Sequence, residues 1–92
     1  MIFVVVSYDI PDDRRRNRVA RVLLDYGSRV QYSVFECRIE VKHYERMCAR
    51  LKKEVNEEED SVRFYQLCQS CLKTVKIIGH GQIEPEPDVV IV

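Results

Sequence analysis

Asp9 is the residue best placed for chemistry in this sequence of 92 residues. It closes the apolar run 2–8, which is typical of a buried strand. A helix start follows at once, with Asp12, Asp13 and several arginines. Open α/β folds commonly place ligands and metals at the carboxyl end of an interior strand, beside a helix N-terminus. Asp9 is therefore the first candidate for a catalytic or metal-binding residue.

Two explanations of Asp9 stay open at this stage. A carboxylate near a helix N-terminus accepts backbone hydrogen bonds and complements the helix dipole, which is a structural role. The alternative is a ligand for Mg²⁺ or Mn²⁺, because one or two carboxylates suffice when a phosphate completes the shell. One Asp per chain is a sparse site, but two meeting across a dimer axis would be adequate. Asp12 and Asp13 are better explained as capping residues.

The charges are distributed unevenly although the formal net charge is zero. Residues 14–29 carry six arginines and one acid, whereas residues 54–60 carry five acids and no base. This pattern predicts one strongly positive and one strongly negative end of the molecule. A positive end is typical of phosphate binding, which bidentate arginine contacts support.

The arginines differ in their expected roles. The candidates for phosphate contact are Arg15, Arg16, Arg18 and Arg29. Arg15 and Arg16 extend the apolar stripe of the first helix toward its start, so we expect them to point near Asp9. For Arg14 and Arg21 a solvated helix face is the better explanation.

Two aromatic residues flank the same region. Tyr8 and Phe35 are candidates for stacking on nucleic-acid bases, and interior packing is the other role open to them. Packing is the more ordinary role for Phe35.

Periodicity predicts a helix over 13–26, with Asp12 as N-cap and Gly27 as the stop, and a second helix over 42–55. An acidic, solvated loop is expected over 56–60. Strands are expected over 2–8, 62–67, 74–78 and 89–92. The stretch 29–40 is also strand-like, but its apolar parity changes near 33–35. A bulge, a bend or a tight hairpin would each explain that change.

This order predicts an α+β fold, a ferredoxin-like sandwich with two helices on one face of a mainly antiparallel sheet. Residues 1–80 form that domain, and residues 81–92 form a linker with a C-terminal edge strand. We expect this strand to add to a sheet edge of a partner subunit, because a chain this short has only a small core of its own. A basic leader and a cleavage site are absent from the N-terminal residues, which predicts a cytoplasmic protein and no membrane segment.

The four cysteines are spread through the sequence in a way that does not resemble a secreted disulfide framework. Cys68 and Cys71 supply half of a zinc site, so such a site would need two chains. A thiol pair in a turn, free or oxidised, is the simpler explanation. His43 and His80 stand alone, and His80 between two glycines is better explained by turn chemistry.

Three segments resemble motifs of the small CRISPR-associated proteins of the Cas-two family. They are 6–13 (VSYDIPDD), 16–19 (RNRV) and 27–36 (GSRVQYSVFE), and the likeness extends over essentially the whole chain. The resemblance implies a ferredoxin-like homodimer that works in CRISPR adaptation, bridges integrase dimers and holds a DNA duplex. It also implies a magnesium-dependent endonuclease acting on single-stranded RNA or double-stranded DNA.

The resemblance further implies roles for single residues. Asp9 matches the metal-binding aspartate that each subunit contributes once. The positions linked with activity or substrate contact are matched by Tyr8, Arg16, Arg18, Arg29 and Phe35. No residue is a convincing general base, so a non-catalytic adaptor that bridges the integrase is the alternative function. A small-ligand regulatory domain of the same fold is a third reading, and it predicts no salt-sensitive DNA binding.

Overall fold

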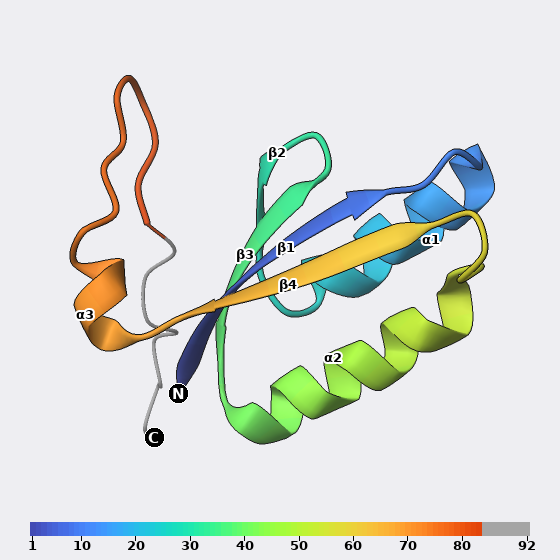
Figure 1. Cartoon of the computed structure of the whole chain (residues 1–92), viewed down its shortest axis with the longest axis horizontal. Helices are drawn as coiled ribbons and strands as arrows, with labels where there is room; N and C mark the ends of the chain where they lie inside the picture. The colour runs from blue at the N-terminus through green and yellow to red at the C-terminus, as the bar shows by residue number, and fades with distance from the viewer. Residues whose placement is uncertain (84–92) are drawn as a thin grey trace.

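The computed structural model describes residues 1–83 of the chain (Figure 1). In chain order the elements are β1 (Ile2–Asp9), α1 (Asp13–Leu24), β2 (Ser28–Gln31), β3 (Val34–Ile39), α2 (Val41–Glu54), β4 (Ser61–Leu67) and α3 (Gln69–Leu72). The predicted α+β class is confirmed, and both long helices lie on one side of the sheet (Figure 1). No helix among the described residues is long and apolar enough to cross a membrane.

The four strands form an antiparallel sheet in the order β2-β3-β1-β4. β1 is central, pairing with β3 from Ile2↔Ile39 to Ser7↔Val34 and with β4 from Phe3↔Leu67 to Asp9↔Ser61. β2 and β4 are therefore the two edge strands. Asp9 lies at the end of a strand that has a neighbour on each side.

The core lies between the helices and one face of the sheet. Successive strand residues point to opposite faces, so Val4, Val6 and Tyr8 point to the helices whereas Val5, Ser7 and Asp9 do not. Fully buried partners come from β3, α1 and α2: Phe35, Cys37, Val19, Leu23, Met47 and Leu51. Each such side chain contributes about 2 kcal/mol through burial. Neither α1 nor α2 lies on the other face of the sheet, which we call the open face.

α1 begins where the sequence predicts and ends two residues earlier than expected. The carboxylate of Asp12 caps it by accepting the Arg15 backbone N–H at 2.9 Å. Gly27 then brings the chain against β3. A Cβ atom at Gly27 would lie 2.2 Å from the Glu36 carbonyl oxygen, so only glycine fits there.

A tight hairpin explains the change in apolar parity within residues 29–40. β2 and β3 are joined at Tyr32 and Ser33, and the register also shifts between Arg29 and Gln31. The hairpin resets the side-chain phase, so Phe35, Cys37 and Ile39 of β3 all point to the core.

The predicted strand 74–78 is wrong. After β4 the chain forms the short helix α3 and then an extended loop without strand pairing (Figure 1). This segment has no neighbouring strand among residues 1–83, and its apolar side chains Val75, Ile77 and Ile78 are exposed. Gly79 and Gly81 adopt positive φ angles of 103° and 126°, as suits a linker. The predicted strand 89–92 lies outside the described residues and stays a prediction.

Candidate functional site at the end of the central strand

Asp9 is exposed on the open face, where it is the last paired residue of β1. Its carboxylate makes no hydrogen bond or ion pair with any residue in 1–83. The capping role that could have explained Asp9 belongs to Asp12 instead. The sheet thus presents a solvent-exposed carboxylate at one end of its central strand.

Arg16 reaches this end from α1. Its Nη1 donates to the Ile10 carbonyl oxygen at 2.9 Å, and its Nη2 pairs with Asp13. The hydrogen bond to Asp13 raises the pKa of Arg16 and keeps it cationic. Its buried Nε has no partner within the described part of the chain. We expected Arg16 to point toward Asp9. Its hydrogen bond to Ile10, the residue after Asp9, is consistent with that expectation.

The β2–β3 turn lies against the same end of the sheet. The Tyr8 N–H donates to the Ser33 carbonyl at 3.1 Å, and the Tyr8 hydroxyl donates to the Tyr32 carbonyl at 3.3 Å. Tyr32 is 70% exposed, and the Arg16 guanidinium carbon lies 5.9 Å from its ring centre. Sequence reasoning assigned Tyr32 to a strand and missed it as a site residue.

Arg63 of β4 is a second residue that sequence reasoning missed. It is exposed and lies opposite Ser7, so it shares the open face with Asp9 as a diagonal neighbour. Its Nη1 donates to the Tyr65 hydroxyl at 3.4 Å. A signal was present, because apolar Val62 and Phe64 alternate with polar Ser61 and Arg63. We refer to Asp9, Arg16, Tyr32 and Arg63 as the Asp9 cluster.

Arg15 makes different contacts from those expected. Its Nε and Nη2 donate to the Asp60 carboxylate at 2.8 and 3.1 Å, and Nη2 also donates to Glu59 at 2.8 Å. Hydrogen bonding to Asp60 raises the pKa of Arg15, and the same bond lowers the pKa of Asp60. Arg15 is therefore used to anchor the loop before β4. Phosphate contact by Arg15 stays a prediction that would compete with these bonds.

The loop 56–60 is not uniformly solvated. The Asp60 side chain is 0% exposed, and it also accepts the Asn56 backbone N–H at 2.8 Å. The prediction of a solvated loop is wrong for this residue, because Arg15 draws its carboxylate inward. Asp60 directly precedes Ser61, the strand partner of Asp9.

Arg18 donates to Glu54 of α2 at 2.8 Å and remains half exposed. Together with the Arg15 contacts, this pair joins the basic and acidic segments of the sequence. The predicted separation into a positive end and a negative end is therefore wrong. The fold packs α1 beside the end of α2 and the loop that follows, so opposite charges meet there.

Phe35 and Tyr8 are buried rather than presented at the surface. Phe35 is 0% exposed and Tyr8 is 4% exposed, and their ring centres lie 6.3 Å apart. Neither ring has a face free to stack on a base in this structure, and the packing role considered for Phe35 is the one observed. Arg29 is exposed, with its guanidinium carbon 5.2 Å from the Phe35 ring centre. The Arg29 guanidinium therefore packs over the Phe35 ring.

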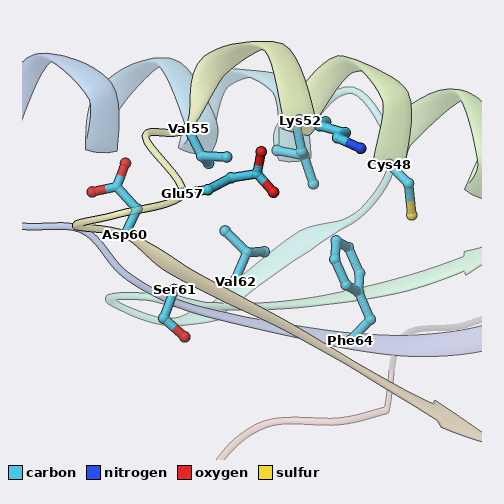
Figure 2. A pocket seen from close by; sticks show the side chains of 9 residues that line it. Cys48, Lys52, Val55, Glu57, Asp60, Ser61, Val62 and Phe64 are labelled. Atoms are coloured by element: carbon cyan, nitrogen blue, oxygen red, sulfur yellow. The ribbon is translucent and has the colours of Figure 1, made fainter.

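A groove of about 480 Å³ runs between α2 and the edge strand β4. Figure 2 shows Cys48 pointing from α2 toward β4, which contributes Val62 and Phe64 to the groove, and Lys52 of α2 also lines it. Burial raises the pKa of the Cys48 thiol. None of the predicted site residues lines this groove, and no residue pattern in the sequence signalled it.

The described residues contain no group of three His, Cys, Asp or Glu side chains arranged to hold a metal ion. At the end of β1, the candidate metal ligand on the open face is the carboxylate of Asp9. The four cysteines form no disulfide. Cys68 and Cys71 are both exposed and lie on the turn after β4.

Comparisons with known proteins agree with this architecture. The family model of CRISPR associated protein Cas2 matches residues 1–75. A CRISPR-associated endoribonuclease Cas2 from Synechocystis sp. is 47% identical over 92 residues, covering 100% of both chains. The crystal structure of Streptococcus pyogenes Cas2 matches with a TM-score of 0.73 and 35% identity, over 84% of this chain and 99% of that one. A chain of a partial Cas6-RT-Cas1–Cas2 complex matches with a TM-score of 0.67 and 32% identity, over 85% and 91%.

Proposed function

The chain belongs to the CRISPR-associated Cas2 family, and on that basis we propose that it acts in CRISPR adaptation as a homodimer that binds nucleic acid and cleaves phosphodiester bonds. The name endoribonuclease, carried by the Synechocystis relative, favours RNA as the substrate to test first. The matching chain in a Cas1–Cas2 complex favours the CRISPR integrase as a partner.

The observation that carries the nuclease proposal is the exposed, unpartnered carboxylate of Asp9 on the open face. A hard divalent cation accepts such a ligand readily, but one carboxylate per chain fits a magnesium or manganese ion only with help. A second Asp9 from a partner subunit and a substrate phosphate would complete the shell. One chain alone supplies too few ligands, but two copies of Asp9 together with a substrate phosphate would fit the metal ion.

A bound Mg²⁺ would supply an activated water and screening for the charge that develops at the phosphate. The remaining work belongs to side chains of the Asp9 cluster. Arg16 and Arg63 approach from α1 and β4, where they can hold the backbone phosphates through charge-assisted hydrogen bonds. The exposed ring of Tyr32 offers a stacking surface for an unpaired base.

The open face is our proposed dimer interface. It carries half-buried Val5 and Val34 together with exposed Tyr65, and neither α1 nor α2 covers it. Two copies packed through this face would bring their Asp9 ends toward a common axis. This arrangement would also place Arg63 of each copy near the partner.

The decisive experiment is cleavage of defined single-stranded RNA and duplex DNA by Asp9→Asn, with and without Mg²⁺. We expect the variant to lose at least about 100-fold in rate, because it removes the only carboxylate assigned to the metal. Glu45→Gln is the matched control, since it removes an exposed carboxylate from α2. Equal cleavage by both variants would reject the site and point to a contaminating nuclease.

A second function is favoured by the sparse metal site and by the similarity to a Cas1–Cas2 complex chain. In it the protein is a non-catalytic adaptor that bridges integrase dimers and holds the DNA duplex. Spacer acquisition in cells separates the two functions. Under the adaptor function Asp9→Asn leaves acquisition intact, whereas reversing the charges of Arg16 and Arg18 abolishes it. Loss of acquisition in Asp9→Asn would favour the catalytic function.

A further inference from the structure

Cys68 and Cys71 lie at the point where the chain leaves the edge strand β4. Both side chains are exposed, and both belong to the turn that forms α3. The turn is well defined, since the Leu72 N–H donates to the Cys68 carbonyl at 2.9 Å and the Thr74 hydroxyl donates to the Cys71 carbonyl at 2.7 Å. The two thiols are therefore held on one turn in a fixed relation.

Cys68 occupies the N-cap position of α3. Its Sγ accepts the backbone N–H of Cys71 at 3.4 Å, the contact that a serine or aspartate oxygen usually makes at this position. Cys68 is extended, with φ −75° and ψ 168°, so its side chain folds over the first turn toward Cys71. Serine is a preferred N-cap residue, so capping alone does not explain why a cysteine stands at position 68.

The other two cysteines differ in their surroundings. Cys37 is fully buried, with its Sγ 3.9 Å from the Met47 sulfur, and Cys48 is half-buried beside the groove. Burial raises the pKa of Cys48, whereas the Cys71 amide lowers the pKa of Cys68. The hydrogen bond to Cys68 raises the pKa of Cys71, which suits a thiol that keeps its proton until the second step.

We propose that Cys68 and Cys71 form a redox-active dithiol that closes to an intrachain disulfide by exchange with a small-molecule disulfide such as oxidised glutathione. The Cys68 thiolate attacks one sulfur of that disulfide, forms a mixed disulfide and expels one thiolate, which takes up a proton. Cys71 then loses its proton and attacks the Cys68 sulfur, and the second small thiol leaves. The protein pair loses two hydrogens and two electrons, and the small disulfide gains them.

The location gives the reaction a structural consequence. A closed Cys68–Cys71 bond ties the start of α3 to its third residue, directly before the loop 73–83. The dithiol form leaves this turn held by hydrogen bonds alone. The proposal is independent of the nuclease and adaptor functions, because no residue of the Asp9 cluster takes part.

The test is incubation of the full chain with mixtures of reduced and oxidised glutathione, followed by acid quench, alkylation, tryptic digestion and mass spectrometry. Trypsin separates the thiols, because cleavage after Arg63 and Lys73 leaves Cys68 and Cys71 on one peptide without Cys37 or Cys48. We expect this peptide to lose two hydrogens. Cys37 and Cys48 should remain fully alkylated.

Two variants make the assignment sharp. Cys71→Ser should accumulate glutathione on Cys68, because the resolving thiol is gone. Cys68→Ser keeps a capping oxygen, and its remaining Cys71 should react roughly tenfold more slowly. Stable glutathione adducts on the wild-type pair without ring closure would overturn the proposal. Reaction of Cys48 at the rate of Cys68 would overturn it as well.

Discussion

The ion pair between Arg15 and Asp60 joins α1 to the loop that precedes β4. The Asp60 side chain is 0% exposed, and Asp60 directly precedes Ser61, the strand partner of Asp9. The sequence could not reveal the pair, because its members are 45 residues apart and each looks like part of a solvated charge run. The position of Asp9 at the end of β1 was predictable, since it depends only on where an apolar run ends.

Asp60→Asn should lower the urea midpoint at neutral pH. The hydrogen bond from Arg15 depresses the pKa of Asp60, so its stabilisation is present above the unfolded value of about 3.9 and is lost as the pH falls below it. The difference between wild type and variant should therefore shrink below about pH 4. A difference that is constant from pH 7 to pH 3 would contradict the assignment, and Glu58→Gln in the same loop is the control.

Arg16→Ala should weaken binding of single-stranded RNA or duplex DNA and reduce the slope of log affinity against log salt by about 1. The reason is the loss of one phosphate contact at the Asp9 cluster. Arg21→Ala removes the same charge from the exposed face of α1 and should change the slope much less. Salt titrations of both variants measure this, and equal slopes would show that only net charge matters.

At the scale of the elements, the two long helices were predictable from the period of their apolar residues, and β1 was predictable from its unbroken apolar run. The hairpin at Tyr32 was one of three solutions to a parity change, and choosing among them required the pairing of β2 with β3. The segment 74–78 has a strand-like composition, but a strand needs a neighbour, and the described sheet offers it none. Sequence alone does not show whether a neighbour exists.

Gly27→Ala tests the close approach between the α1–β2 connection and β3. The added Cβ would lie 2.2 Å from the Glu36 carbonyl and 2.9 Å from the Cys37 Cα, so backbone must move. We expect a loss of about 2 kcal/mol in unfolding free energy, measured by urea denaturation. Gly79→Ala has nothing within 4 Å of its Cβ and serves as a control for backbone strain alone. A cost at Gly27 no greater than at Gly79 would contradict the packing argument.

At the scale of the whole molecule, the open face should decide the oligomeric state. Tyr65→Glu places a charge on that face, where Tyr65 lies opposite Val5, and should shift the protein toward monomer in sedimentation velocity. Val41→Glu charges an equally exposed apolar position at the start of α2 and should leave association unchanged. A dimer that survives Tyr65→Glu but not Val41→Glu would move the interface to the helical side.

The central place of β1 also sets an order of events during synthesis. Among the described strands β1 is synthesised first, and it needs two neighbours, residues 34–39 and 61–67. One flank of its valine-rich stretch therefore stays unpaired until residues 61–67 have been translated. In a nascent chain halted before residue 61, one edge of β1 would lack its hydrogen-bonding neighbour. We expect chaperones or proteases to bind such fragments.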